Sequence, residues 1–292
     1  MKKIILVLLS AFLLNNSFSQ AVKQSPEKGE YAVFAKLGSE RSAARGWMDT
    51  IHFPPAEYGS SLLWVLVKPY YLSTPQVNAL TRLTAPPANS SDRTRKELDY
   101  LLQLQQNRTP DQVKQVTALG NLGYWPQIAG LKTHPDHQQV LQDLYFESRT
   151  VLGDQCKAEH YPLTTKLLEN IMLDDRVMEF TIKYTYLRPR PYHLEKRLQP
   201  LDHINSPSYA SGHSLWAYLQ AYVWSELLPQ KRDEFLKIAE EIRHSREIMG
   251  IHYPSDNSAS RTIAFQMLQY YHTNPQFKKD FKAALSEWKK ND

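Results

Sequence analysis

The chain has 292 residues, of which 42% are hydrophobic and 22% are charged, and its formal net charge is +5. That length and apolar content suffice for one sizeable core, while the dispersal of basic residues among acidic ones argues against a nucleic-acid-binding face. Cys156 is the only cysteine in the sequence, so an intramolecular disulfide is excluded.

The first nineteen residues have the order of a secretory signal peptide. Two lysines precede an apolar run, Ile4 to Leu14, and small and polar residues follow it. The run is too short to span a bilayer comfortably, although an uncleaved anchor is the alternative. We expect cleavage near Ser19-Gln20 and hence a periplasmic or secreted protein. No later stretch reaches membrane-spanning length, which predicts a soluble mature protein without stable membrane insertion.

Residues 20–80 read as an N-terminal extension of unclear role, irregular up to about residue 60 because glycine and proline interrupt it. Ser91 or Asp92 can cap a helix that runs through Gln106, and Thr109-Pro110-Asp111 starts another one. Apolar residues then recur at helical spacing over six segments: 136–152, 162–187, 211–228, 230–249, 256–272 and 275–289. No linker is long enough to separate two domains. We therefore predict an all-α protein whose single helical domain covers residues 81–292.

Within this helical pattern, Lys183 lies in the last turns of a predicted helix, and the run Arg188-Pro189-Arg190-Pro191 forces an extended exit from it. A helix end and an extended arm can therefore bring Lys183 and Arg190 to one point. The planar fork of arginine matches two phosphate oxygens, and lysine adds a compact charge. Arg188 is offset from Arg190 by two residues and would share its side, but spacing does not decide which of the two points inward.

Ser211, Gly212 and His213 follow a loop and open a strongly apolar helix. Ser211 is a natural N-cap, and the glycine beside it lets another group approach the backbone. The free amides of a helix N-terminus form an anion site, which His213 in the first turn can also reach. Because a helix N-terminus disfavours an imidazolium, a bound anion is needed to keep His213 protonated. A serine cap with a surface histidine is the structural alternative.

The stretch SREIMGIHYPSD, residues 245–256, places a histidine in a tight connection between two helices. A glycine should end the first helix after Arg246, and Ser255 or Asp256 is suited to cap the second. Asp256 can hold one ring nitrogen of His252, which makes the other nitrogen a better nucleophile or base. The structural alternative is that these residues are helix caps and surface ion pairs.

Taken together, three motifs resemble the signature of the type 2 phosphatidic acid phosphatase (PAP2) superfamily: Lys183-x6-Arg190-Pro191, Ser211-Gly212-His213 and Ser245-Arg246-x5-His252-x3-Asp256. The exported helical form in that superfamily is the class A bacterial non-specific acid phosphatase. The stretch APPANSSDRTRKELDYLL resembles the segment that precedes the catalytic domain there, and the similarity covers roughly residues 84 to 272. One departure is Ala210, which stands where the family usually has proline.

The resemblance implies a helical bundle of the PAP2, acid phosphatase and vanadium haloperoxidase type, and an enzyme that hydrolyses phosphomonoesters through a phosphohistidine. His252 would attack phosphorus, with Asp256 orienting its ring. His213 would protonate the leaving alcohol and later activate the hydrolytic water. The phosphate oxygens would be held by five residues: Lys183, Arg190, Ser211, Gly212 and Arg246. No metal and no other cofactor is implied.

Two other functions are compatible with the same motifs. A vanadate-dependent haloperoxidase would use this site, because vanadate resembles the trigonal phosphoryl transition state. A phospholigand-binding protein without turnover would need neither the two histidines nor Asp256. The expected partners are small phosphorylated substrates and inorganic phosphate, with no nucleic acid, and a homodimer is the oligomer to test. The physiological substrate cannot be derived from the motifs.

Other polar residues are assigned to the protein framework. His134-Pro135-Asp136-His137 is interpreted as a capping region rather than a metal site, because aspartate is a good helix cap. His193 and His203 are expected to line the cleft without reacting. Asp174 and Asp175 are expected to lie on a solvated helix face.

Overall fold

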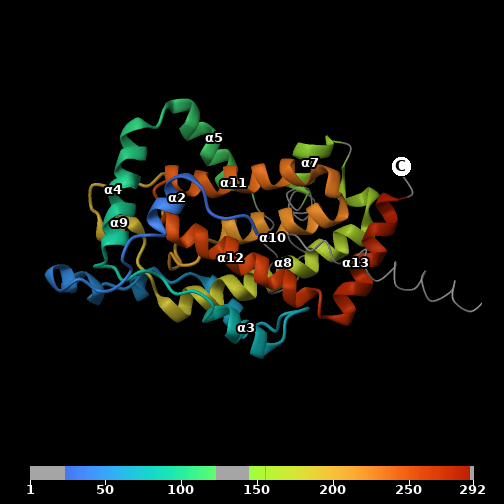
Figure 1. Cartoon of the computed structure of the whole chain (residues 1–292), viewed down its shortest axis with the longest axis horizontal. Helices are drawn as coiled ribbons and strands as arrows, with labels where there is room; N and C mark the ends of the chain where they lie inside the picture. The colour runs from blue at the N-terminus through green and yellow to red at the C-terminus, as the bar shows by residue number, and fades with distance from the viewer. Residues whose placement is uncertain (1–23, 123–144, 155, 290–292) are drawn as a thin grey trace, which may run out of the picture.

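A computed structural model describes residues 24–122, 145–154 and 156–289 of the chain (Figure 1). These residues form helices and no strand, which confirms the all-α prediction. Five helices match predicted segments to within two residues at each end: α8 (Pro162–Tyr186), α10 (Gly212–Leu227), α11 (Arg232–Ile248), α12 (Pro254–Tyr271) and α13 (Pro275–Trp288). The predicted signal peptide and the 134–137 segment lie outside the described residues.

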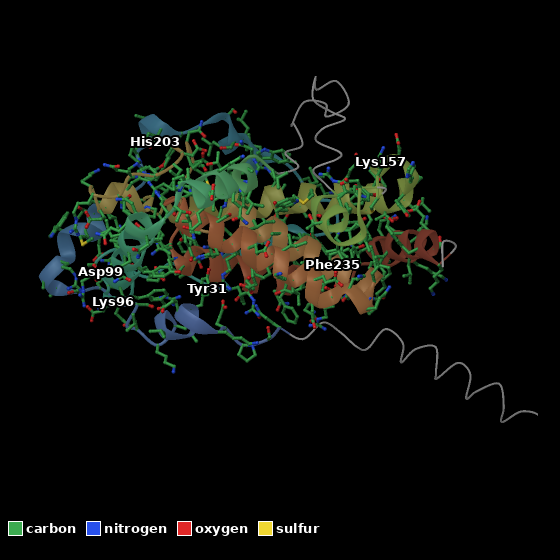
Figure 2. The ribbon with its side chains drawn as sticks, turned by 90° about the horizontal axis from the view of Figure 1, so that it is seen from above. Tyr31, Lys96, Asp99, Lys157, His203 and Phe235 are labelled. Atoms are coloured by element: carbon green, nitrogen blue, oxygen red, sulfur yellow. The ribbon has the colours of Figure 1, made fainter. Side chains whose placement is uncertain are left out.

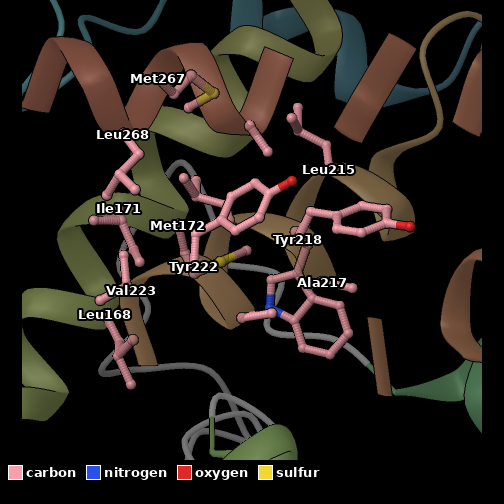
Figure 3. Close-up of a cluster of buried hydrophobic side chains, with 14 of the residues drawn as sticks. Leu168, Ile171, Met172, Leu215, Ala217, Tyr218, Tyr222, Val223, Met267 and Leu268 are labelled. Carbon is pink, nitrogen blue, oxygen red and sulfur yellow. The ribbon is translucent and has the colours of Figure 1, made fainter. Parts of the chain in front are cut away.

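The central helix of the fold is α10, whose side chains are buried on nearly every side. A helix that is apolar all around must be surrounded by other helices, and α10 packs against α8, α11 and α12. Figure 3 shows part of the resulting core, in which side chains of these helices interdigitate: Ile171 and Met172 of α8, Tyr218, Tyr222 and Val223 of α10, and Met267 and Leu268 of α12. This core fixes the ends of α8, α10 and α11 relative to one another.

Two further helices cover one end of the body, α4 (Asp92–Asn107) and α5 (Pro110–Asn121) (Figure 1). Both predicted starts are confirmed, because the side chains of Ser91 and Thr109 accept hydrogen bonds from amides in the first turns. Both helices pack against α11. The C-terminal end of α5 thereby reaches the N-terminal end of α10, where the backbone oxygen of Gly120 lies 3.1 Å from a ring nitrogen of His213.

The N-terminal extension contains more helix than the sequence predicts: α2 (Gly29–Phe34), the 3₁₀ helices η2 (Ala43–Thr50), η3 (Pro55–Glu57) and η4 (Ser60–Leu66), and α3 (Thr74–Thr81). The prediction of an irregular segment up to residue 60 is therefore wrong in part. A six-residue helix is not stable alone, and α2 is held by tertiary contacts such as the hydrogen bond from Tyr31 to Glu247 at 2.6 Å. Figure 2 shows Tyr31 of the extension on the opposite side of the molecule from His203. Glu57, which also belongs to the extension, lines the same cavity as His203. The extension therefore wraps around the body.

The prediction that Asp174 and Asp175 are solvated is wrong, because both side chains are fully buried. The Asp174 carboxylate accepts hydrogen bonds from the backbone N–H groups of Tyr70, Tyr71 and Leu72, and so ties the extension to α8. Burial raises the pKa of Asp174 to about 7, although these hydrogen bonds act in the opposite direction. Helical spacing did not predict this burial, since it depends on a segment one hundred residues away in the sequence.

The cap of α12 also differs from the prediction. Tyr253 occupies the N-cap position in place of Ser255 or Asp256, and Pro254 is the first helical residue. Proline suits the first turn of a helix, because the amide it lacks would have no partner within the helix. Asp256 therefore lies in the first turn, where its carboxylate accepts the Tyr253 N–H at 3.1 Å. The remaining short helices are α7 (Phe146–Leu152), η6 (Ala158–His160), α9 (Pro191–Leu194) and η7 (Pro229–Lys231).

None of the described helices combines the length and the apolar character needed to cross a bilayer.

Candidate active site

A cavity of about 210 Å³ lies where the C-terminal half of α8, the N-terminal end of α10 and the end of α11 meet the segment before α12. Six of the eight predicted site residues line it: Lys183, Arg190, Gly212, His213, Arg246 and His252. The other two, Ser211 and Asp256, are fully buried behind the wall of the cavity. The fold thus brings residues from all three sequence motifs into one small volume.

The ring of His252 is held from both sides. Its Nδ1 lies 3.1 Å from Oδ2 of Asp256, and its Nε2 lies 2.9 Å from a guanidinium nitrogen of Arg190. Arginine can only donate, so we assign the Nε2 lone pair to face Arg190 and the proton to Nδ1. Burial and the charge of Arg190 lower the pKa of His252 well below its usual value. The site therefore holds a neutral imidazole whose Nε2 lone pair accepts a hydrogen bond from Arg190 at the cavity wall.

The carboxylate of Asp256 accepts hydrogen bonds on both oxygens. Its Oδ2 binds the Tyr253 N–H and the Ser208 hydroxyl besides His252, while its Oδ1 accepts from Arg188 at 2.6 Å. Burial alone would raise the pKa of Asp256, but Arg188 and His252 together hold it well below its usual range. An ionised Asp256 is what fixes the Nδ1–H tautomer of His252.

Arg188 and Arg190 point to different places, although both are buried. Arg190 lines the cavity and donates to the backbone oxygens of Ser206 and Ile251. Arg188 lies behind the cavity, where it contacts Asp256. The expectation that the two share one side is wrong, because Arg190 is the N-cap of α9 and the extended segment ends there.

Three of the predicted site residues are cations that line the cavity, and each is only 1% exposed: Lys183, Arg190 and Arg246. Lys183 donates to the backbone oxygen of Pro207 at 2.7 Å, and Arg246 donates to the Ser245 hydroxyl at 2.9 Å. Burial lowers the pKa of Lys183 to about 7, and burial lowers that of Arg246 to about 10. Because isolated buried charges are costly, this arrangement favours binding of an anion between them.

His213 lines the cavity in the first turn of α10, so the alternative of a surface histidine is excluded. Its Nε2 lies 3.1 Å from the backbone oxygens of both Gly120 and Leu122, at the end of α5. Burial, followed by the charges of Arg246 and His252, lowers the pKa of His213 well below its usual value, while the two carbonyl groups raise it. A bound anion near Arg246 would offset the charge that keeps His213 neutral.

Ser211 occupies the N-cap position of α10, as predicted, but its hydroxyl does not bond to an amide of that helix. It donates to the Ser214 hydroxyl at 3.1 Å, and Ser214 in turn donates to Asn257 at 2.8 Å. The hydroxyl of Ser211 therefore points away from the cavity. It must rotate before it can donate to an oxygen bound there.

Three charged residues in the cavity wall were missed by the motif analysis: Arg176, Glu179 and Asp202. Arg176 and Glu179 lie on α8 and line the cavity beside Lys183. Their spacing of three and four residues along one helix is the signal that could have revealed them, because residues at those offsets share a helix face. Among the described residues, no group of three or more histidine, cysteine, aspartate or glutamate side chains is arranged to hold a metal ion.

A second cavity of about 670 Å³ adjoins the site and shares Ile204 and Asn205 with it. His193 and His203 line this second cavity rather than the one that holds His252. His193 is further held by Glu57 of the N-terminal extension, at 3.3 Å. The two histidines thus lie at the edge of the site, outside the cavity that holds His252.

Residues 163–280 match the family model of the PAP2 superfamily. The chain carries a PAP2 superfamily domain. The match spans α8 to α13 and includes all eight predicted site residues, so the resemblance inferred from the three motifs is confirmed. The PAP2 match begins after the N-terminal extension, α4 and α5, so these elements lie outside it.

Relatives and solved structures agree with the PAP2 match. The chain is 28% identical over 194 residues to a non-specific acid phosphatase of Providencia stuartii, covering 62% of this chain and 78% of that protein. It is 24% identical over 227 residues to a non-specific acid phosphatase of Salmonella typhimurium, covering 76% of this chain and 84% of that protein. The crystal structure of the first bacterial vanadium-dependent iodoperoxidase superposes with a TM-score of 0.55 at 15% identity, over 82% of this chain and 63% of that one. This last likeness confirms the fold.

Proposed function

We propose that this protein is an exported acid phosphatase that hydrolyses phosphomonoesters through a phosphohistidine intermediate. The PAP2 domain and the relatives named non-specific acid phosphatases support a phosphatase function. The observation that carries the mechanism is the orientation of His252. Asp256 holds its Nδ1, while its Nε2 meets Arg190 at the wall of a cavity that is lined by buried cations.

In the first step, the Nε2 lone pair of His252 attacks phosphorus, and the bond from phosphorus to the leaving oxygen breaks. Arg190 then donates to a phosphoryl oxygen instead of to the ring. The ring of the phosphohistidine carries a positive charge, which the ionised Asp256 stabilises through Nδ1–H.

Negative charge on the equatorial oxygens is balanced by Lys183, Arg190 and Arg246, with the Gly212 amide and the rotated Ser211 hydroxyl as further donors. Phosphoryl transfer needs mainly positioning and electrostatic stabilisation of this kind. We therefore propose that turnover needs no added metal, which an assay with excess EDTA tests directly.

His213 acts first as an acid and then as a base. Bound phosphate offsets the charge of Arg246, and the carbonyl groups of Gly120 and Leu122 stabilise the imidazolium. Protonated His213 gives its proton to the leaving alcohol. The neutral ring then takes a proton from water, whose oxygen attacks the phosphohistidine and releases inorganic phosphate and neutral His252.

For the chain as a whole, we propose a signal peptide over residues 1–19, cleaved near Ser19-Gln20, an N-terminal extension over residues 20–80 and a phosphatase domain over residues 81–292. Small phosphorylated compounds and inorganic phosphate are the proposed ligands. A homodimer remains a prediction to be tested by the mass of the protein in solution.

The deciding experiment is hydrolysis of p-nitrophenyl phosphate by the mature protein with excess EDTA, beside the variant His252→Ala. Turnover that persists with EDTA and disappears in the variant supports the proposal. Halide oxidation by added hydrogen peroxide in the presence of vanadate would favour the haloperoxidase instead, since vanadate fits a cationic pocket that binds phosphate. Tight phosphate binding without hydrolysis between pH 4 and 8 would favour a phospholigand-binding protein.

A further inference from the structure

The cavity wall contains a buried carboxylate that phosphate binding does not require. Glu179 lies on α8, one turn before Lys183, and its side chain is 7% exposed. Its Oε2 accepts a hydrogen bond from a guanidinium nitrogen of Arg176 at 2.5 Å, and its Oε1 lies 3.8 Å from Nζ of Lys183. A negative charge therefore sits among the cations that the proposed mechanism assigns to the phosphate oxygens.

The same carboxylate lies against the first residue of α10. A Cβ atom built on Gly212 would come within 2.1 Å of Oε1 of Glu179. The group that approaches the backbone at this glycine is thus the side chain of Glu179. Because a helix N-terminus favours negative charge, Oε1 occupies the region where an incoming phosphate oxygen would also be most stable.

Arg176 keeps the carboxylate in this place. Its guanidinium carbon lies 4.4 Å from the ring centroid of Phe180 and 5.8 Å from that of Trp64, so aromatic faces from α8 and η4 hold it. One oxygen of Glu179 is therefore anchored by Arg176, while the other faces Gly212 and Lys183. The anchored oxygen allows the carboxylate to turn without losing its arginine partner.

We propose that Glu179 is an internal anion that competes with phosphate for the cationic cavity and thereby sets the affinity of the site. This inference rests on the proposed function, because it takes phosphate to bind among Lys183, Arg190 and Arg246. Before phosphate binds, Glu179 balances part of their charge. When phosphate enters, Oε1 turns away from Lys183, and the lysine transfers its interaction to a phosphate oxygen.

The consequence for turnover is faster release of product. A site lined by several buried cations and without an internal anion would hold inorganic phosphate tightly, and tight product binding slows each cycle. Glu179 weakens the binding of substrate and of inorganic phosphate alike, so its removal should lower KM and the inhibition constant for phosphate together, without raising kcat.

The test is calorimetric titration of inorganic phosphate into the wild type and Glu179→Gln at pH 5.5, below the pKa of about 7 to which burial lowers Lys183. We expect the variant to bind phosphate at least tenfold more tightly, and its KM for p-nitrophenyl phosphate to fall in parallel. Glu169→Gln is the matched control, because Glu169 lies on the same helix outside the cavity and pairs only loosely with Lys166, at 3.8 Å. Its phosphate affinity should stay within twofold of the wild type.

Unchanged or weaker phosphate binding in Glu179→Gln would overturn the proposal, since it would make Glu179 a support for Lys183 and Arg176. If that variant does not fold, Glu179→Asp decides, because its shorter side chain withdraws the charge from Gly212. Tighter phosphate binding by Glu179→Asp supports the proposal, and unchanged phosphate binding contradicts it. A wild type that binds phosphate and gains affinity on Glu179→Gln, but hydrolyses no ester, would retain this inference and contradict only the proposed function.

Discussion

Arg188 and His252 bind opposite oxygens of the same carboxylate. Oδ1 of Asp256 accepts from Arg188 at 2.6 Å, while Oδ2 lies 3.1 Å from Nδ1 of His252. Arg188 also lies 3.6 Å from Glu97 and 3.9 Å from the centroid of the Tyr253 ring, in a region closed to solvent. Arg188, one of the unspecified residues within the motif Lys183-x6-Arg190-Pro191, thus holds the proposed nucleophile indirectly, by keeping its carboxylate partner charged and oriented.

Replacing Arg188 by methionine should therefore destabilise the protein strongly. The change leaves Asp256 and Glu97 buried without their shared cation, and breaking a buried ion pair typically costs about 3–5 kcal/mol. The free energy of unfolding from urea titration at pH 7 measures this. Arg95→Met is the control, because Arg95 forms a long and exposed contact with Asp92, worth about 1 kcal/mol or less. Equal losses in the two variants would contradict the assigned role of Arg188.

The histidine roles predict different fates for the covalent intermediate. In His213→Ala, attack by His252 on p-nitrophenyl phosphate should persist, because p-nitrophenolate leaves without much help from an acid. Hydrolysis of the phosphohistidine should slow by about 10²–10⁴-fold, the usual contribution of a general base. Acid-quenched phosphoenzyme should thus accumulate in His213→Ala and be absent in His252→Ala. Phosphoenzyme that forms in His252→Ala would rule out this nucleophile.

The pH profile of kcat/KM should be bell-shaped with an acidic optimum. His252 must be neutral and His213 protonated, and the free protein lowers the pKa of both below their usual values, chiefly through burial. Lys183, with a pKa lowered to about 7 by burial, binds phosphate when protonated, so kcat/KM should fall further as the pH rises through 7. Bound phosphate should raise the pKa of His213 and Lys183. The optimum of kcat should therefore lie at a higher pH than the optimum of kcat/KM. A value of kcat/KM that stays constant up to pH 9 would contradict the assigned protonation states of His252 and His213.

Gly212→Ala should destabilise the protein by about 1–3 kcal/mol, the usual cost of inserting a methyl group into a packed region. The new Cβ would meet the Glu179 carboxylate, which must move away from Gly212. The double variant Gly212→Ala with Glu179→Ala removes the clashing group and should recover stability relative to Gly212→Ala. Thermal or urea unfolding of the two single variants and the double variant measures the coupling. Additive effects would mean that the two residues do not touch in solution.

Much of the helical framework could be predicted from local sequence. Apolar spacing located α8 and α10 to α13 because each helix must bury one face, and α10 every face, against its neighbours. Side-chain caps marked the starts of α4 and α5, since Ser91 and Thr109 bond to amides only three residues away. Such signals act over a few residues, so they are visible in the sequence itself.

The grouping of the candidate residues in space could also be predicted, since six of the eight line one cavity and the other two lie directly behind it. The direction in which each side chain points could not be predicted from the sequence. Whether Arg188 or Arg190 enters the cavity depends on where α9 begins and on Asp256, sixty-eight residues after Arg188. The buried position of Asp174 depends in the same way on the segment around Tyr71.

By itself, the sequence determined the helical class, the positions of the main helices and the chemistry of a cationic site with two histidines, because these follow from periodicity, capping and residue type. Only the tertiary structure decided that Glu179 lies against Gly212, that Arg188 supports Asp256 from behind, and that the end of α5 reaches His213. Each of these contacts joins elements that are distant in the chain. The packing of whole helices, which no local pattern specifies, brings them together.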